Sequence, residues 1–414
     1  MTCSHLPARS GIDLSPLDVT AVRDDFPILR RPVGGRPVAY LDSAATSLKP
    51  QPVIDAVVGF YERYTANVHR GAHRFGREAS ERFDAARETI ASFINAETRE
   101  VVFVRNATEA INLVARSLPA DAAVLTTLAE HHSNALPWRC RGPCHNVRID
   151  PDGRIDTAHL GELLARFRPR LVAVSYVTNA FGVVNPVDDV VREAHAAGAL
   201  VLVDGSQAVP HRPVDVKSLG CDFLCFSGHK MCGPSGIGVL YGKRERLEEL
   251  SFFHYGGDMV AEVHESEFVA RGVPWRLEAG TPFIEGAIGL AAACEYLDAL
   301  GLDRIERHER ELVRYALHRL ADVPGVTVHG PTSCRDRAGS VSFTVRGLEA
   351  HAVARILSDR DDIFVRSGYH CAQPLHEAFG LPPTVRASFY LYNDAEEIDR
   401  LAAALGRLRT HLSP

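Results

Sequence analysis

Short apolar runs that alternate with helical stretches constrain the fold of this chain most strongly. Between about residues 100 and 240, each run rich in Val, Leu and Phe is followed by a longer stretch with helical periodicity. This alternation is typical of a parallel β-sheet covered by helices on both faces. We expect strands at Val101–Val104, Val124–Thr127, Leu171–Ser175, Leu200–Val203 and Asp222–Phe226.

The last third of the chain has a different pattern. A helical stretch begins near Ile284 and continues into a charged amphipathic segment at Glu306–Ala321. Beyond it the periodicity predicts an α+β arrangement. Its expected strands are Ser340–Val345 and Val385–Tyr392, and its expected helices are Glu349–Ser358 and Ala395–Leu408.

These patterns predict three parts. Residues 1–35 form an N-terminal segment with a short helical stretch that includes Pro16–Asp24, and we expect this segment to pack on the small domain. Residues 36–300 form a large domain that holds the sheet. Residues 301–414 form the smaller α+β domain.

The charge pattern excludes several classes of partner. The 414 residues carry a net charge of -6, and Lys and Arg are scattered among Asp and Glu. We therefore expect neither nucleic acid nor membrane binding. No apolar run approaches the roughly 20 residues that span a bilayer, and the N-terminus lacks an uninterrupted hydrophobic signal core. A cytoplasmic protein is expected.

The nine cysteines are dispersed and are expected to be reduced thiols. The pairs Cys140/Cys144 and Cys221/Cys225 share a spacing, and His145 adjoins the first pair, so a metal site is one interpretation. This spacing fits no common zinc module, and we expect no metal.

Two polar residues follow buried strands in positions that suit cofactor chemistry. Asp204 ends the run VLVD, where a buried acid needs a cationic partner such as a protonated pyridine nitrogen. An N-cap for the next helix is the alternative. Lys230 follows the next run on one turn with Ser227 and His229, and it is the best Schiff-base candidate in the chain. Its amine needs a partly desolvated pocket near other cationic groups.

Three further segments follow strands. Thr108 lies at the start of a helix, where a phosphate can bind, although helix caps of this kind are common. His131 can lie flat against an aromatic cofactor or belong to a structural cluster. Asn179 suits a hydrogen bond to a cofactor ring oxygen or a substrate carboxylate, and its alternative is a turn asparagine.

A thiol lies on a glycine-containing loop near the C-terminus. Cys371 in RSGYHCA is beside Arg366 and His370, and neighbouring positive charge favours the thiolate. A lone loop cysteine is more often inert than catalytic, so this position depends on its context.

The chain resembles the SufS-type cysteine desulfurases of the class V aminotransferase family, from about Asp25 to Leu408. The resemblance rests on eight ordered segments: YLDSAATSLKP, NVHRGAH, TEAINLVA, EHHSNALPW, VDGSQAVPHRPVDV, FSGHKMCGPSGIGVLY, EAGTP and RSGYHCAQPL. It implies the pyridoxal-phosphate-dependent transferase fold type I, with a mostly parallel seven-stranded sheet between helices and a smaller C-terminal domain that carries the cysteine loop. It also implies the cofactor pyridoxal 5'-phosphate.

Residue roles carry over by position. The resemblance implies that Lys230 holds the cofactor, Asp204 pairs with its ring nitrogen, His131 stacks on the ring and takes part in catalysis, and Gln207 bonds its phenolic oxygen. The residues expected to contact the cofactor phosphate are Ala107 through its backbone amide, Thr108, Ser227, His229, and Thr281 from a second subunit. Four residues are expected to bind the substrate: Arg386 and Asn179, which would contact its carboxylate, together with Arg366 and His370.

The implied reaction is the conversion of L-cysteine to L-alanine. Lys230 moves the α proton, and the thiolate of Cys371 attacks the substrate sulfur and keeps it as a persulfide. A homodimer and a sulfur-acceptor protein of SufE-like or SufU-like type are expected, for iron–sulfur cluster assembly or a sulfur-containing metabolite. Alternatives are a selenocysteine lyase or related C–S lyase, a desulfurase dedicated to one pathway, and a non-catalytic scaffold.

Three positions depart from the family's usual residues. Asn106-Ala107 replaces Gly-Thr and removes one hydroxyl from the phosphate site, Tyr369 replaces His beside the nucleophile, and Phe283 follows EAGTP. Because the helix terminus and its amides remain, we expect weaker cofactor retention at most.

Overall fold

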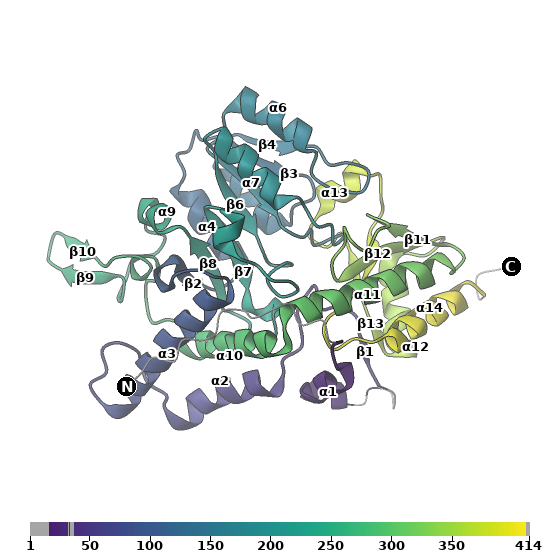
Figure 1. The fold of residues 1–414 in the computed structure, drawn as a ribbon, viewed down its shortest axis with the longest axis horizontal. Coiled ribbons are helices and arrows are strands. Elements are labelled where there is room, and N and C mark those ends of the chain that lie inside the picture. The colour runs from purple at the N-terminus through teal and green to yellow at the C-terminus, as the bar shows by residue number, and fades with distance from the viewer. Residues whose placement is uncertain (1–15, 32, 34–36, 411–414) are drawn as a thin grey trace.

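The computed structural model describes residues 16–31, 33 and 37–410 of the chain. The molecule has a large lobe and a small lobe, and the long helix α11 (Leu302–Ala321) runs from one to the other (Figure 1). Within the described residues, no helix is long and apolar enough to cross a membrane.

A seven-stranded sheet forms the centre of the large lobe, in the order β2-β8-β7-β6-β5-β3-β4. Strand β8 is antiparallel to both of its neighbours, and the other pairs are parallel. The prediction of a mostly parallel seven-stranded sheet is therefore confirmed. The strands are β2 (Val101–Val104), β3 (Val124–Thr127), β4 (Cys144–Val147), β5 (Leu171–Ser175), β6 (Leu200–Asp204), β7 (Phe223–Ser227) and β8 (Gly238–Gly242).

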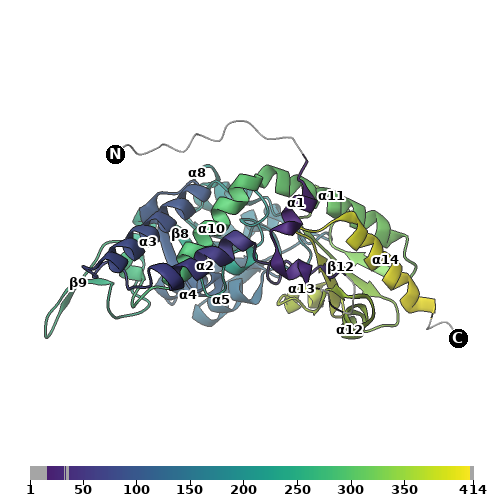
Figure 2. The same cartoon turned by 90° about the horizontal axis from the view of Figure 1, so that it is seen from below.

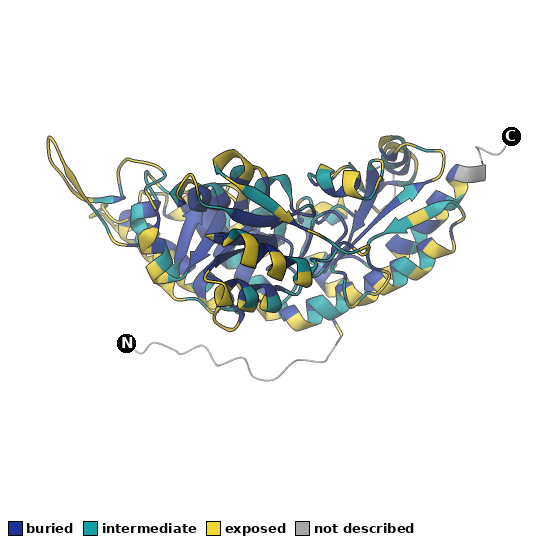
Figure 3. Ribbon diagram, turned by 90° about the horizontal axis from the view of Figure 1, so that it is seen from above, coloured by how far each residue is buried: buried dark blue, intermediate teal, exposed yellow. Residues whose placement is uncertain are grey.

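Helices cover both faces of this sheet, which explains why its strands read as continuous apolar runs. In β5, Val172 and Val174 pack into one core cluster, and Leu171 and Ala173 pack into the opposite one. Figure 3 shows the strands as the buried interior of the lobe. The first cluster includes α2 (Gln51–Arg63), α3 (Arg74–Phe93), α6 (Thr157–Phe167), α7 (Val187–Ala196), α8 (Val216–Leu219) and α10 (Ile284–Leu300). The second includes α4 (Ala107–Ser117), α5 (Leu136–Arg141) and α9 (Arg244–Glu249).

A two-stranded hairpin, β9 (Val260–Val263) and β10 (Phe268–Ala270), projects from the end of the large lobe farthest from the small one (Figure 1). Three apolar side chains of the hairpin, Val263, Phe268 and Val269, are exposed to solvent. Tyr255, which precedes the hairpin, is more exposed still, at 70%.

The small lobe is an antiparallel sheet in the order β11-β12-β15-β14, packed against helices. Its strands are β11 (Val326–His329), β12 (Ser340–Val345), β14 (Arg366–Gly368) and β15 (Thr384–Ser388), and its helices are α12 (Ala350–Asp361), α13 (Gln373–Ala378) and α14 (Ala395–Thr410). A separate pair joins β1 (Ala39–Tyr40) to β13 (Ile363–Phe364), and Ala39 is buried in the core of the small lobe.

The described part of the N-terminal segment contacts both lobes. Helix α1 (Val19–Asp24) is shorter than the predicted stretch, and Figure 2 shows it beside α11 and near α14. Arg23 forms an ion pair of 3.0 Å with Glu397, and the ring of Phe26 meets Tyr392 at 4.8 Å and Tyr296 at 6.1 Å. The proposed three-part division remains a prediction, and residues 1–15 lie outside the described part.

One predicted strand is wrong in its second half. Strand β15 ends at Ser388, whereas Val385–Tyr392 was expected to be extended throughout. The chain turns because the Asn393 side chain accepts a hydrogen bond from the Tyr390 amide at 2.8 Å, and the Asn393 amide donates to Tyr390 O at 3.0 Å. The aromatic residues there are buried in the core, so their β-type pattern reflects packing and not a strand.

Candidate active site

A cavity of about 240 Å³ lies where the carboxyl ends of the large-lobe strands face the small lobe. Strand ends, where loops meet helix N-termini, are the usual place for ligand sites in such sheets. Twelve predicted site residues line it: Ala107, Thr108, His131, Asn179, Asp204, Ser227, His229, Lys230, Arg366, His370, Cys371 and Arg386. Lys230 and Cys371 thus line the same cavity, although they are 141 positions apart in the chain (371 minus 230).

Two predicted site residues do not line this cavity. The Gln207 amide lies beside it and is occupied, since Nε2 donates to Ala44 O at 2.8 Å and to Asn179 Oδ1 at 2.9 Å. Thr281 lines a different cavity of about 470 Å³ together with Phe283. The contact of Thr281 with the phosphate bound to a second subunit remains a prediction.

Lys230 is held on a short turn, Gly228–Lys230, that directly follows β7. Three side-chain donors bind the carbonyl of His229: Thr46 Oγ1 at 3.0 Å, Ser47 Oγ at 3.1 Å and Lys49 Nζ at 3.0 Å. Burial lowers the pKa of Lys230 to about 8, Asp204 opposes that shift, and Arg386 adds to it. A substantial fraction of its amine is therefore neutral near physiological pH, as a nucleophilic lysine requires.

Asp204 and His131 face the same space from two neighbouring segments. Asp204 ends β6, is buried, and accepts a hydrogen bond from the Ser206 amide at 3.0 Å. His131 accepts one from the Ser133 amide through Nδ1 at 3.1 Å. Burial, with the nearby charge of Lys230, lowers the pKa of His131 to about 4. The imidazole is therefore neutral, and an aromatic ring can lie against it without meeting a positive charge.

One end of the cavity has hydroxyl groups and a helix N-terminus, which suit an anion. Helix α4 begins there, and Thr108 Oγ1 lies 2.7 Å from Ser133 Oγ. The Ala107 amide donates to Ser227 Oγ at 2.9 Å, so that hydroxyl keeps its own proton free for another acceptor. Hydroxyl donors and a helix N-terminus together suit a phosphate. Ser133, for which no role was predicted, adds a hydroxyl to this end of the cavity.

The opposite end has an arginine that suits a carboxylate. Arg386 on β15 is fully buried, and Nη1 donates to Asn179 O at 2.8 Å and to Asn179 Oδ1 at 3.0 Å. Its Nη2 lies 3.6 Å from Asp42 Oδ1, and its Nε and Nη2 make no hydrogen bond within the described structure. Burial lowers its pKa to about 10, so the guanidinium stays charged at neutral pH. Arg366 is opposite it in the neighbouring strand.

Cys371 enters the cavity from the loop after β14. The loop is held by its neighbours: the His132 amide donates to Cys371 O at 2.7 Å, and His370 Nε2 lies 2.9 Å from Thr384 Oγ1. Burial, together with the charge of Arg386, lowers the pKa of His370 to about 2. His370 is therefore neutral in this loop.

Sequence reasoning missed several residues that shape the cavity. Ala44, Ser133 and Ser206 line the cavity, and Asp42 pairs with Arg386. All four lie within the segments that carry the resemblance, but no pattern assigned them a role. Glu130 is also fully buried, and its carboxylate accepts hydrogen bonds from Thr127, Asn134 and Ser175 side chains at 2.9, 2.7 and 2.5 Å. Burial raises its pKa to about 7. The run of polar residues after β3 was the sequence feature that could have indicated Glu130 and Ser133.

The cysteine pairs weighed as metal ligands show no such arrangement. Among residues 16–31, 33 and 37–410, no group of three or more His, Cys, Asp or Glu side chains is placed to hold a metal ion. The ring of His145 stacks on Phe167 at 3.7 Å, and all eight cysteines in this part of the chain are free thiols.

Comparison with known proteins places this geometry in a family. Residues 39–401 match the family described as Aminotransferase class-V. A cysteine desulfurase of Pectobacterium atrosepticum is 46% identical over 403 residues, covering 94% of this chain and 98% of the relative. A probable cysteine desulfurase of Halalkalibacterium halodurans is 45% identical over 398 residues, covering 93% and 97%.

Two solved structures agree with these sequence matches. The apo structure of a cysteine desulfurase from Thermococcus onnurineus superimposes with a TM-score of 0.90 at 38% identity, covering 96% of this chain and 99% of that one. The cysteine desulfurase CsdA (S-sulfonic acid) from Escherichia coli gives a TM-score of 0.86 at 35% identity, covering 96% and 100%. Over nearly its whole length, this chain therefore belongs to the aminotransferase class-V family and is similar to the cysteine desulfurases within it.

Proposed function

We propose that this chain is a pyridoxal-phosphate-dependent cysteine desulfurase that converts L-cysteine to L-alanine and keeps the sulfur as a persulfide on Cys371. The observation that carries the proposal is that Lys230 and Cys371 line one cavity with a buried arginine, Arg386. The relatives named above carry the same activity in their names.

The donor set of the cavity fits pyridoxal phosphate. Thr108, Ser133, Ser227 and the start of α4 would hold its phosphate, and Asp204 would face its ring nitrogen. Lys230 would bond its aldehyde carbon. When bound, this cofactor supplies an electron-withdrawing ring that makes the α proton of an attached amino acid removable.

The chain's own residues then position the substrate and move its protons. Arg386, whose Nε and Nη2 make no hydrogen bond within the described structure, would bind the cysteine carboxylate. The neutral amine of Lys230 would take the α proton, and its conjugate acid would return a proton to the carbon skeleton. His131 would lie beside the ring, and its neutral imidazole would add no competing charge.

Cys371 would then receive the sulfur. Its thiolate attacks the substrate sulfur, so an S–S bond forms as the Cβ–S bond of the substrate breaks. The electron pair of the broken bond stays with the carbon skeleton, which gains a proton and becomes alanine. The sum is one cysteine and one thiol in, one alanine and one persulfide out.

We also propose a homodimer and a sulfur-acceptor protein of SufE-like or SufU-like type, serving iron–sulfur assembly or a sulfur-containing metabolite. In the dimer, Thr281 of one chain would contact the phosphate bound to the other. The support for this dimer contact is that Thr281 does not line the cavity of Lys230 and Cys371 within the same chain.

The wild-type protein tests the function directly. Incubation with L-cysteine should release alanine, and mass spectrometry of the Cys371 peptide should show one added sulfur atom that a reductant removes. Alanine release without sulfur on this peptide would contradict the assigned role of Cys371. A parallel assay with selenocysteine tests the lyase alternative, which requires turnover of selenocysteine to persist when Cys371 is replaced.

The pKa of Lys230 makes cofactor uptake pH-dependent. Only the neutral amine bonds an aldehyde, and its fraction grows as pH rises toward the pKa of about 8. The rate at which cofactor-free protein takes up pyridoxal phosphate should therefore rise about tenfold per pH unit below that value and level off above it. Absorbance stopped-flow measures this rate. A rate that keeps rising past pH 9 or so would indicate an ordinary lysine.

A further inference from the structure

The backbone of the cysteine loop is in an unusual conformation. His370 and Cys371 are consecutive non-glycine residues with positive φ, at 51° and 54°, and Gly368 before them has φ 122°. A side chain with a Cβ atom disfavours this left-handed region, and two such residues in succession are uncommon. Surrounding contacts must therefore hold the loop in place.

Two donors from the large lobe bind the carbonyls of these same two residues. Asn179 Nδ2 donates to His370 O at 2.6 Å, and the His132 amide donates to Cys371 O at 2.7 Å. Asn179 follows β5 and His132 follows β3, so both donors come from the carboxyl ends of large-lobe strands. The conformation of the small-lobe loop is thus fixed from across the cavity.

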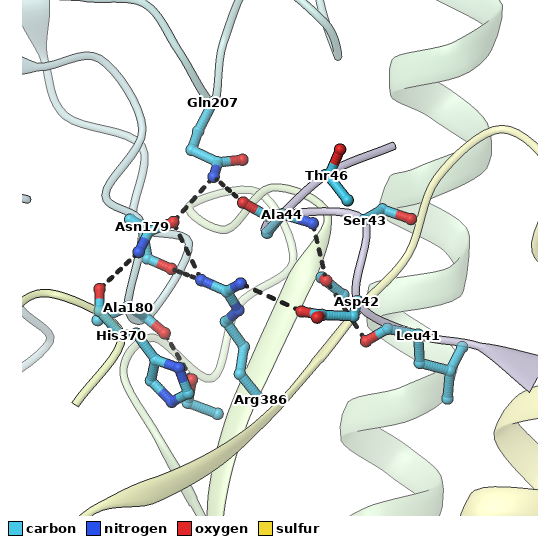
Figure 4. Close-up of polar contacts among 12 residues, drawn as sticks. Leu41, Asp42, Ser43, Ala44, Thr46, Asn179, Ala180, Gln207, His370 and Arg386 are labelled. Carbon is cyan, nitrogen blue, oxygen red and sulfur yellow. Dashed lines mark hydrogen bonds and ion pairs between the residues drawn. The ribbon is translucent and has the colours of Figure 1, made fainter. Parts of the chain in front are cut away.

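The amide of Asn179 can point only one way. Its Oδ1 accepts from Arg386 Nη1 at 3.0 Å and from Gln207 Nε2 at 2.9 Å, so the Nδ2 hydrogens must face the His370 carbonyl. The Gln207 amide is oriented in turn by its bond to Ala44 O at 2.8 Å. Figure 4 shows Asn179 between the Arg386 guanidinium and the His370 carbonyl.

We propose that Asn179 is a positioning residue for the nucleophile, because its side chain holds the His370–Cys371 loop in the left-handed conformation and ties it to Arg386. This inference rests on the proposed function and goes beyond it. The Asn179 amide contacts both Arg386, which would bind the substrate carboxylate, and the loop that carries the Cys371 thiol. It therefore sets the position of one relative to the other. The thiol therefore keeps a fixed place relative to the bound substrate.

The substitution Asn179→Asp tests this with little change in shape. The aspartate keeps an oxygen for Arg386 and Gln207, but its second oxygen faces the His370 carbonyl, where a donor is needed. In protein loaded with pyridoxal phosphate and without cysteine, the loop should loosen. We expect alkylation of Cys371 by iodoacetamide and amide hydrogen exchange at residues 368–372 to accelerate roughly three- to tenfold, the effect of losing one hydrogen bond.

The result separates positioning from general damage. A negative charge by itself disfavours a nearby thiolate and slows alkylation, so faster alkylation reports loop release. Exchange in β5 and β6 should stay at the wild-type rate. The control Ser367→Ala removes the contact of 2.6 Å between Ser367 Oγ and His351 Nδ1 in the same segment, and should change neither rate.

Unchanged alkylation and exchange in Asn179→Asp would overturn the proposal, as would equal acceleration in Ser367→Ala. Should the aspartate variant fail to fold, Asn179→Ser is measured by the same criteria. Both readouts are taken on the resting protein. Failure of the desulfurase assignment would appear separately, as absence of alanine release by the wild type.

Discussion

The variant Cys371→Ser should lose alanine production from cysteine by on the order of a thousandfold or more, the size of loss seen when an enzyme's covalent nucleophile is removed. Serine has nearly the volume of cysteine, so the loop and the cavity should persist. Its hydroxyl is a poor nucleophile at neutral pH, because it ionises far less readily than a thiol. Alanine release and the absorbance of bound pyridoxal phosphate are measured side by side.

The control for this variant is Cys140→Ser, which replaces an exposed free thiol on α5. It should retain wild-type turnover. In Cys371→Ser the cofactor absorbance should also be unchanged, since none of the proposed phosphate or ring contacts involves the thiol. Undiminished alanine release from cysteine would remove Cys371 from the mechanism.

Lys230→Ala should abolish both covalent cofactor attachment and turnover. The amine has two proposed tasks, bonding the aldehyde and moving the α proton, and loss of a proton-transfer group alone typically costs 10²- to 10⁴-fold, roughly. Residual binding through the anion site and Asp204 is expected, so pyridoxal phosphate should bind but be removed by gel filtration. Absorbance before and after filtration, together with alanine release, gives the result.

Two companions sharpen the Lys230 experiment. Lys217→Ala, at an exposed position on α8, should behave as wild type. Lys230→Arg keeps a positive charge beside Asp204 but cannot bond an aldehyde at neutral pH, so it should fail like the alanine variant. Cofactor that stays attached to Lys230→Ala through filtration would show that another group forms the bond.

Much of the large lobe was predictable from local pattern. Strands β2, β3 and β5 have the predicted limits, because side chains buried on both faces of a sheet leave continuous apolar runs. Asp204 and Lys230 were singled out because they follow such runs, and both line one cavity at the carboxyl ends of the strands. In parallel strands, the order of strand and loop along the chain is enough for that inference.

Local pattern failed where a side-chain hydrogen bond decides the course of the backbone. The run after Ser388 reads as strand from its aromatic residues, yet the Asn393 side chain turns it. The contact of Gln207 with the cofactor came from the resemblance and remains a prediction; its amide donates to Ala44 O and Asn179 Oδ1. Ala44 and Asn179 are both distant from Gln207 in the sequence, so no sequence periodicity predicts these two contacts.

The sequence by itself predicted the layered fold, and together with the family resemblance it selected Lys230, Asp204 and Cys371 as the proposed reactive groups. Only the tertiary structure decided how the small lobe presents its thiol: it sets Asn179 between Arg386 and His370, at 3.0 and 2.6 Å, and holds two residues at positive φ. The reason is physical. Residue type and spacing determine which groups can react, whereas the conformation of a strained loop depends on donors that the folded chain brings from the other lobe.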